Sequence, residues 1–349
     1  EILGRTDIKS LTLSELNNSI AELGLPKFRA GQIYSWLHKQ FAVSFDEMTN
    51  LSKDLRASLS ESFEIRNCEI EQKLVSKLDG TVKYLFRLND DEFVESVLMK
   101  YKYGYTVCIS SQVGCNMKCS FCASTIDGCK RNLTPSEMLS QIYAISRDMD
   151  IRVSHIVLMG MGEPLDNYDN VLRFFELITN ADGQNISARH ISISTCGIVP
   201  KIYDLIEKHP QFTLSVSLHA PTDELRSQIM PVNKAWNVDE LLKACRVYTE
   251  TTSRRISFEY AMMSGINDTD ECARELIKKL RGMLCHVNLI PANEVRENDY
   301  KRSTDKRVQT FKEILESGGL NVTVRRSLGG DIDASCGQLR RNRRKEEKL

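Results

Sequence analysis

The feature that most constrains the fold of this chain is the alternation of two kinds of segment between Tyr105 and Gly318. Short apolar segments there alternate, about six times, with longer segments whose apolar residues recur at helical spacing. Such alternation predicts a parallel sheet, because each parallel pair of strands needs a long crossover connection, usually a helix. The expected fold is therefore α/β, and the periodicity leaves open whether the sheet lies flat or curls into an open barrel.

The expected helix at 134–149 has the clearest beginning, because Thr134, Pro135 and Glu137 supply a cap, a first-turn proline and a first-turn acid. The other expected elements are strands at 105–109, 155–160, 189–195, 212–218, 255–262, 286–290 and 321–325, and helices at 168–179, 199–208, 222–251, 268–281 and 303–317. Ligands of parallel α/β sheets gather at the carboxyl ends of the strands. Residues at those ends are therefore the candidates for chemistry.

The regions before this core follow other patterns. Residues 1–66 predict a small helical domain, in which Tyr34 and Trp36 are expected in the core, and basic residues such as Arg29 could contact RNA. Residues 67–104 change to a period of two around an Asp-Gly turn, which predicts a β-meander. Glu95 interrupts an apolar-rich strand there, and its default interpretation is a carboxylate that faces solvent. The α/β core domain is expected at 105–340, followed by a basic tail at 341–349.

Three cysteines follow the first strand of the core with the spacing C-x3-C-x2-C, namely Cys115, Cys119 and Cys122. Three thiolates this close can converge on one metal centre, and three ligands to a [4Fe-4S] cluster leave one iron open for a substrate. Unrelated buried thiols, or a zinc site whose fourth ligand lies elsewhere, are the alternatives. The chain has 11 cysteines, an odd number at uneven spacing, which argues against a disulfide framework and favours a reducing cytoplasm.

Polar residues occupy several of the strand ends. The turn at 160–164 contains Gly162, which lets the backbone approach a ligand, and Glu163, which offers an acceptor for an ammonium group. Ser194 and Ser217 end the next two strands, and Asn293 follows the strand at 286–290. Hydroxyl groups at neighbouring strand ends can contact a carboxylate or a ribose, although buried serines are common.

The C-terminal loop carries a lone cysteine, Cys336, between glycines and acidic residues. A lone cysteine there usually has no function, but this loop could fold back over the mouth of the sheet. The basic segment 340–345 is a candidate RNA contact, while its default interpretation is a solvated terminus. Lys+Arg and Asp+Glu both number 47, so net charge points to neither nucleic acid nor membrane. No apolar run approaches the roughly 18 residues that span a bilayer.

Five motifs, at 108–115, 115–122, 159–165, 217–221 and 331–339, together resemble the RlmN/Cfr family of radical S-adenosylmethionine (SAM) RNA methyltransferases. The resemblance covers roughly residues 90–340. It implies an incomplete (βα)6 barrel, one [4Fe-4S] cluster on the three spaced cysteines and two molecules of SAM per turnover. The implied contacts to SAM are Gly162, Glu163, Ser194, Ser217, Leu218, His219 and Asn293. Residues 1–66 would be the accessory RNA-binding domain, and Cys129 and Cys196 would be bystanders.

The resemblance also implies roles for three residues outside the cluster motif. Cys336 would accept a methyl group from SAM, Cys108 would resolve the covalent RNA intermediate through a disulfide bond, and Glu95 would do acid/base work. The implied substrates are adenosines of 23S rRNA and tRNA, methylated at carbon 2. A protein such as flavodoxin or ferredoxin would be the electron donor of the enzyme.

Other functions stay open at this point. Cfr-type relatives share every motif and methylate carbon 8 of the same rRNA adenosine. A non-catalytic iron-sulfur or zinc protein that binds RNA, and a radical SAM enzyme that acts on protein, are further alternatives. The chain also departs from the family at 292–294, where it has Ala-Asn-Glu in place of Trp-Asn-Pro and keeps the asparagine.

Overall fold

A computed structural model of the chain describes residues 5–208, 210–292, 300–332, 334 and 339–340. Its central feature is a ten-stranded sheet, in which seven neighbouring strands are parallel. These strands are β6 (Gly104–Cys108), β9 (Val153–Leu158), β10 (Ile191–Thr195), β11 (Thr213–Ser217), β12 (Ile256–Met262), β13 (Cys285–Pro291) and β14 (Val322–Val324). The predicted α/β class is therefore confirmed.

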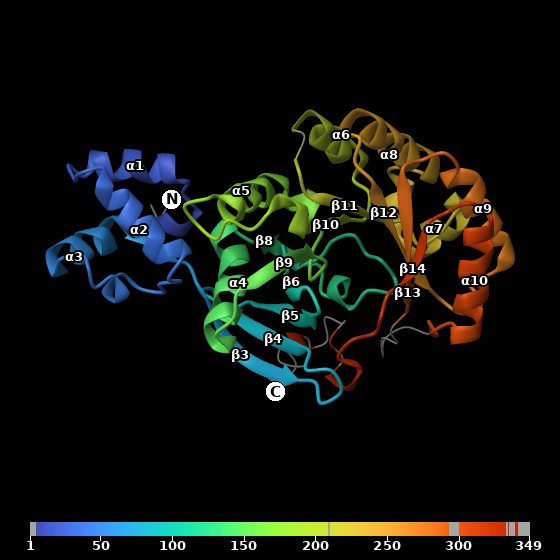
Figure 1. The fold of residues 1–349 in the computed structure, drawn as a ribbon, viewed down its shortest axis with the longest axis horizontal. Helices are drawn as coiled ribbons and strands as arrows, with labels where there is room; N and C mark the ends of the chain where they lie inside the picture. The colour runs from blue at the N-terminus through green and yellow to red at the C-terminus, as the bar shows by residue number, and fades with distance from the viewer. Residues whose placement is uncertain (1–4, 209, 293–299, 333, 335–338, 341–349) are drawn as a thin grey trace.

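Three antiparallel strands extend this sheet beyond β6, namely β3 (Cys68–Val75), β4 (Val82–Leu88) and β5 (Phe93–Tyr101). The spatial order runs from β14 to β3 without closing, since these two strands are the edges and do not pair with each other. Figure 1 shows the sheet curving from β3 to β14 with helices on its outer side. The sheet is thus an open barrel, which periodicity alone could not decide.

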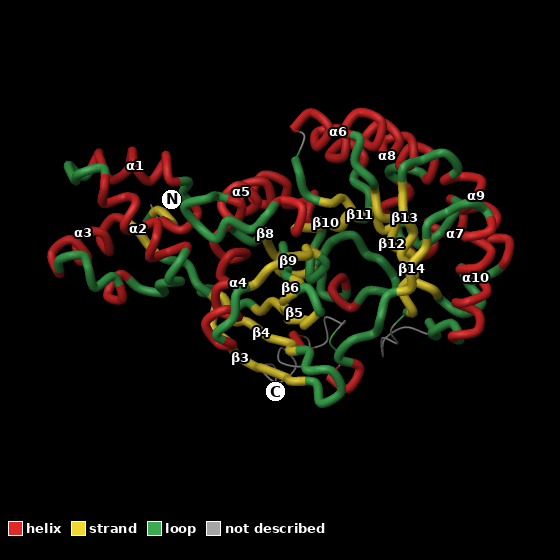
Figure 2. Tube along the Cα trace, in the orientation of Figure 1, coloured by secondary structure: helices red, strands yellow, loops and turns green. Residues whose placement is uncertain are grey.

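Helices cover the outer face of the sheet and follow the strands in turn (Figures 1 and 2). They are α4 (Pro135–Met149), α5 (Tyr168–Thr179), α6 (Val199–Lys208), α7 (Asp223–Ile229), α8 (Val238–Thr252), α9 (Asp270–Leu280) and α10 (Asp305–Ser317). Helix α4 begins as predicted, because Thr134 and Glu137 each accept a hydrogen bond from the other's backbone N–H. The predicted helical span 222–251 is divided into α7 and α8 by a short 3-10 turn at Pro231–Lys234.

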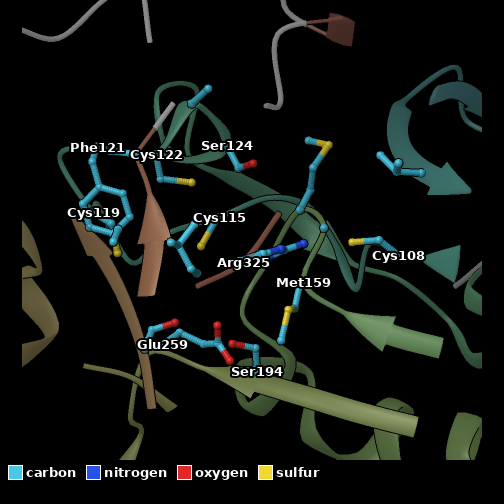
Figure 3. A pocket seen from close by; sticks show the side chains of 18 of the residues that line it. Cys108, Cys115, Cys119, Phe121, Cys122, Ser124, Met159, Ser194, Glu259 and Arg325 are labelled. Carbon is cyan, nitrogen blue, oxygen red and sulfur yellow. The ribbon is translucent and has the colours of Figure 1, made fainter. Parts of the chain in front are cut away.

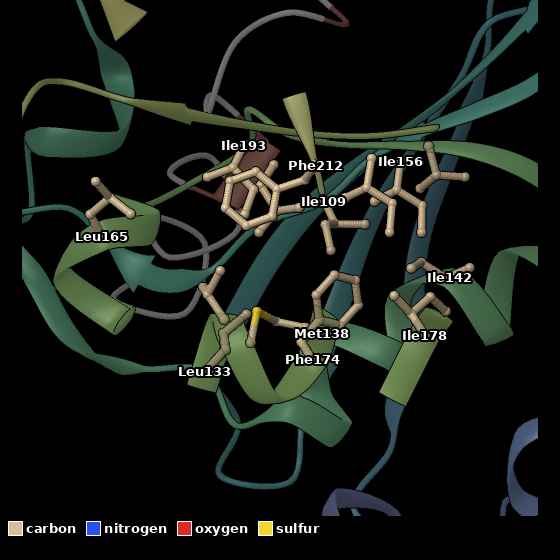
Figure 4. Close-up of a cluster of buried hydrophobic side chains, with 14 of the residues drawn as sticks. Ile109, Leu133, Met138, Ile142, Ile156, Leu165, Phe174, Ile178, Ile193 and Phe212 are labelled. Atoms are coloured by element: carbon tan, nitrogen blue, oxygen red, sulfur yellow. The ribbon is translucent and has the colours of Figure 1, made fainter. Parts of the chain in front are cut away.

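The main core lies between the sheet and these helices. Figure 4 shows one part of it, where Met138 and Phe174 from two helices lie against Ile156 and Ile193 from two strands. Residues of a strand point alternately to its two faces, so those that lie between the core residues point to the inner side of the curved sheet. Ser194, which alternates with buried Ile193 in β10, is therefore available to a ligand on the inner side.

The N-terminal region consists of α1 (Leu13–Glu22), α2 (Phe28–His38) and α3 (Lys53–Ser62), tied together by a short parallel pair of β1 (Thr6–Asp7) and β2 (Phe63–Glu64). Tyr34 is buried as predicted, and Trp36 is half-buried with its indole N–H donating to Asn50 Oδ1 at 2.6 Å. Sequence reasoning missed the short strand pair. Among the described residues, none of the helices combines the length and the apolarity that a membrane span requires.

The prediction that Glu95 faces solvent is wrong. Glu95 is 5% exposed and forms an ion pair with Lys83 of β4, with 3.0 Å between Oε2 and Nζ. The backbone N–H of Arg340 donates to Glu95 Oε1 at 2.9 Å, so Arg340 covers the side of β5 on which Glu95 lies. Arg340 itself is 2% exposed, which also contradicts a solvated terminus beginning at this residue.

Candidate active site

A cavity of about 360 Å³ opens at the carboxyl ends of the parallel strands and on the inner side of the curved sheet (Figure 3). It brings together most residues that the sequence singled out, although they come from elements far apart in the chain. Those that line it are Glu95, Cys108, Cys115, Cys119, Cys122, Gly162, Glu163, Ser194, Ser217 and His219. Leu218 is buried in the main core instead. Asn293 and Cys336 lie outside the described residues.

The three spaced cysteines lie on a loop with a defined backbone. It is bounded by a hairpin of β7 (Gln112–Gly114) and β8 (Cys129–Asn132), which sequence reasoning missed. The N–H of Cys115 donates to Gly128 O at 3.1 Å, and that of Cys122 to Cys119 O at 3.1 Å. Gly114 has a φ of 86°, and a Cβ there would lie 1.9 Å from Gly128 O. Only glycine allows this close approach of the two strands.

The chemistry of these three thiols fits an iron-sulfur cluster. All three line the cavity, where Phe121 and Met230 supply apolar neighbours. Burial raises the pKa of Cys115 to about 12 and also raises the pKa of Cys119 and Cys122. Because the ligand form is the thiolate, cluster binding must displace these protons. Among the described residues no His, Cys, Asp or Glu triad is set to hold a single metal ion.

The turn after β9 places a carboxylate on the floor of the cavity. Gly162 has a φ of 103°, and a Cβ there would lie 2.6 Å from Gln112 Cβ. Glu163 is 3% exposed, and its two carboxylate oxygens accept the backbone N–H groups of Leu165 at 3.0 Å and Cys196 at 2.7 Å. Burial raises the pKa of Glu163, and these hydrogen bonds oppose the rise. The carboxylate therefore has a fixed orientation and spare acceptor capacity.

His219 is held in place by the next strand rather than free to titrate. Its Nδ1 accepts the backbone N–H of Ala261 at 2.9 Å, which leaves Nε2 to carry the proton of the neutral ring. Burial lowers the pKa of His219 to about 3, so the ring is neutral at physiological pH. The Phe121 ring contacts it edge-on, with 4.9 Å between centroids. His219 thus offers the cavity a neutral hydrogen-bond donor.

Two charged residues of the cavity were missed by sequence reasoning. Glu259 of β12 is 4% exposed, and it accepts Asn288 Nδ2 at 2.8 Å and Ser257 Oγ at 3.2 Å. Arg325, directly after β14, reaches into the cavity between Cys115 and Cys108 (Figure 3). Burial raises the pKa of the Cys108 thiol, and the charge of Arg325 opposes this. A carboxylate within an otherwise apolar strand was the signal available for Glu259.

Comparisons with known proteins match both the N-terminal region and the sheet region of the chain to RNA methyltransferases or radical SAM proteins. Residues 109–280 match the model of the radical SAM superfamily, and residues 6–65 match that of the ribosomal RNA large subunit methyltransferase N-terminal domain. The chain is 55% identical over 335 residues to a probable dual-specificity RNA methyltransferase RlmN of Lachnospira eligens, covering 96% of each chain. It is 54% identical to that of Lachnoclostridium phytofermentans, covering 98% of this chain and 96% of that one.

This chain belongs to the RlmN family. A solved structure supports the same assignment, since a radical SAM methyltransferase from Sphaerobacter thermophilus is similar with a TM-score of 0.92 and 43% identity, over 95% of this chain and 98% of that one. As an RlmN enzyme, the protein is a radical SAM RNA methyltransferase that uses a [4Fe-4S] cluster and SAM. The cavity has the thiols, the carboxylate and the hydroxyls that such cofactors require.

In this RlmN enzyme, described residues on both sides of Cys336 in the sequence contact the β3–β5 extension. On one flank, Asp331 accepts Ser76 Oγ at 2.6 Å and Lys77 N–H at 2.9 Å, and Gly329 N–H donates to Asp79 at 2.8 Å. On the other flank, Arg340 donates to Glu95. The cysteines among the described residues are free thiols, including Cys108.

Proposed function

We propose that the enzyme methylates carbon 2 of adenine in 23S rRNA and in tRNA. The observation that carries the proposal is that Cys108 lines the same cavity as the three cluster cysteines. A thiol that must resolve a covalent intermediate has to reach the place where the radical chemistry occurs. The relatives are named as probable dual-specificity RNA methyltransferases, which supports two classes of RNA substrate.

The reaction needs more than a nucleophilic methyl transfer. Carbon 2 of adenine is electrophilic, so it cannot attack the methyl group of SAM directly. The cluster and SAM supply, when bound, the one-electron chemistry that an unactivated C–H bond requires. Cys336 would accept a methyl group as a thiolate, which is the nucleophilic form of cysteine. The resulting S-methylcysteine carries the carbon that becomes bonded to the base.

Cys108 would then release the product. After the methyl carbon has bonded to carbon 2 and the C2 proton has left, the Cys108 thiolate attacks the sulfur of Cys336. The sulfur–carbon bond breaks and a disulfide bond forms between the two cysteines. The electron pair of the broken bond goes to the methylene carbon, which takes up a proton and becomes the methyl group of the product. Two electrons from a reductant, such as flavodoxin or ferredoxin, restore both thiols. Arg325 would favour the Cys108 thiolate by its charge.

Glu95 would take part in the proton transfer. Burial raises its pKa, while Lys83 and the N–H of Arg340 oppose the rise. A carboxylate with a raised pKa is a better general base near neutral pH than an ordinary one. Its contact with Arg340 also gives Glu95 a positioning role, because it holds one flank of the segment that carries Cys336.

The proposed contacts to SAM are the strand-end residues of the cavity. Glu163 would accept the ammonium group, while Ser194, Ser217 and His219 would contact the carboxylate and the ribose; Gly162 would give the backbone room to approach. Leu218 would contribute through its backbone, and Asn293 would meet the adenosine.

We further propose residues 1–66 as the accessory RNA-binding domain, 67–104 as a β-meander or linker extension, 105–340 as the radical SAM core and 341–349 as a basic tail. The cytoplasmic location stays a prediction.

Product analysis tests the position of methylation. Reconstituted enzyme is incubated with SAM, a low-potential reductant and either a 23S rRNA fragment or tRNA, and the digested nucleosides are separated by mass spectrometry. The expected product is 2-methyladenosine from both RNAs, whereas 8-methyladenosine would identify a Cfr-type enzyme. Cys108→Ala is expected to accumulate a covalent protein–RNA adduct that Cys336→Ala cannot form. Cys272→Ala, a change on helix α9, serves as the matched thiol control and should behave as wild type.

A further inference from the structure

Arg226 on helix α7 is a fully buried cation with unusual partners. It is 0% exposed, and its guanidinium donates to three backbone carbonyls, those of Cys196 at 2.6 Å, Leu218 at 3.1 Å and Ser217 at 3.2 Å. A fourth bond reaches Asn233 Oδ1 at 3.2 Å. All four acceptors are uncharged, and Arg226 takes part in none of the ion pairs formed by the described residues.

Carbonyl groups solvate a buried cation but do not neutralise it. Placing a charge in a protein interior is unfavourable unless a countercharge compensates. Two carboxylates lie one residue away from Arg226 in the hydrogen-bond network. Exposed Asp223 is reached through the Asn233 side chain, and buried Glu163 accepts the N–H of Cys196, whose carbonyl binds Arg226. Among the described residues, no carboxylate forms a direct ion pair with Arg226.

The iron-sulfur site lies next to this charge. The end of α7 contacts the cluster loop, where Ser120 N–H donates to Ile229 O at 2.9 Å. Cys119, Ile229 and Met230 belong to one buried apolar group. Arg226 does not line the cavity, so it is not positioned to bind SAM or RNA itself.

We propose that Arg226 is the buried countercharge of the [4Fe-4S] cluster and that its fixed positive charge favours the reduced cluster. Three thiolate ligands make the site anionic, and reduction adds one more negative charge next to the guanidinium. In the apolar surroundings of Cys119 this attraction is weakly screened. Charge and hydrogen bonding around a cluster are known means by which proteins set its reduction potential. Arg226 is thus a positioning and tuning residue, which acts through the cluster.

Midpoint potentials separate this role from a structural one. Arg226→Gln removes the charge, Arg226→Lys keeps it, and Asn233→Asp places a carboxylate against the guanidinium while leaving its three bonds to backbone carbonyls. Arg254→Gln is the matched control, because Arg254 binds the carbonyls of Gln211 and Phe212 near the opposite end of strand β11. Each reconstituted full-length variant is titrated anaerobically, without RNA, and the reduced cluster is followed by electron paramagnetic resonance.

The expected result is a more negative midpoint potential for Arg226→Gln and Asn233→Asp, and a potential like that of wild type for Arg226→Lys and Arg254→Gln. A potential unchanged in both charge-altering variants would overturn the proposal, as would an equal shift in Arg226→Lys and Arg226→Gln. Iron and sulfide content together with circular dichroism report folding. If Arg226→Gln does not fold, Asn233→Asp decides the question, because the arginine and its carbonyl bonds are still present.

Discussion

Removing the cation of the buried pair Lys83–Glu95 should destabilise the enzyme in a pH-dependent way. Lys83 is 0% exposed and Glu95 is 5% exposed, and their charged atoms lie 3.0 Å apart. Lys83→Met leaves the carboxylate buried with the backbone N–H of Arg340 but without this ion pair. Breaking a buried ion pair by removing one partner costs about 3–5 kcal/mol, because an uncompensated charge remains in the interior.

This free energy converts into a measurable shift in unfolding temperature. Unfolding entropy is about 2.1 cal/mol/K per residue, which for 349 residues gives about 0.7 kcal/mol/K. A loss of about 3–5 kcal/mol therefore lowers the Tm by about 4–7 °C. Differential scanning calorimetry or intrinsic fluorescence at pH 8 measures the shift. Lys73 of the neighbouring strand β3 forms a partly exposed pair with Asp148 of α4, and Lys73→Met, which breaks this pair, should cost about 1 kcal/mol or less.

The pH dependence identifies the cause. Burial already raises the pKa of Glu95 above its ordinary value, and loss of Lys83 raises it further. A carboxyl group whose folded pKa is raised does not penalise folding at low pH, where it is protonated in both states. Its penalty grows as pH rises from the unfolded pKa through the folded one. The deficit of Lys83→Met should therefore be smallest near pH 5 and largest near pH 8.

A neutral partner should rescue the variant. In Lys83→Met combined with Glu95→Gln, no charge is buried, and the glutamine oxygen can still accept the N–H of Arg340. Most of the lost Tm is expected to return. The reasoning is refuted if Lys83→Met unfolds within 1 °C of wild type at pH 8, or if its deficit is the same at pH 5 and pH 8.

Three further changes test the cavity. Glu163→Gln should weaken SAM binding, measured by equilibrium dialysis, by about 10-fold or more, as expected for the loss of a charged hydrogen-bond acceptor. Its iron content should equal that of wild type, and an unchanged SAM affinity would remove Glu163 from the SAM site. Gly162→Ala should abolish detectable SAM binding, because its Cβ would lie 2.6 Å from Gln112 Cβ at a φ of 103°; an alanine variant that binds normally would contradict this. Arg325→Gln should raise the pKa of Cys108, so that iodoacetamide modifies this thiol only at higher pH, as mapped by peptide mass spectrometry; an unshifted profile would show that the charge does not act on Cys108.

Local patterns predicted those features of the chain that depend on neighbouring residues. Helix α4 begins where Thr134, Pro135 and Glu137 predict it, because a capping box involves only residues three positions apart. The strands and helices of the core follow from short-range periodicity, and the three cysteines of the cluster lie within eight consecutive residues. The motif resemblance then led to the family that the comparisons confirm.

The predictions that were wrong concern long-range contacts. Glu95 was expected in solvent because its strand pattern carries no information about what covers the strand. The residue that covers it, Arg340, is 245 positions away. Arg226 and Glu259 were missed for the same reason, since the burial of a charged side chain depends on elements that pack around it from distant parts of the sequence.

The sequence by itself determined the class of fold, the ligands available for a cluster and the family. Only the tertiary structure decided that the sheet curves without closing and that Cys108 shares a cavity with Cys115, Cys119 and Cys122. It also decided that Asp331 and Arg340, on either side of Cys336 in the sequence, contact the β3–β5 extension. Spacing along the chain specifies which groups exist and which local conformations they prefer. Their distances in space, and the burial that sets their charges and pKa values, arise only when the strands and helices pack together.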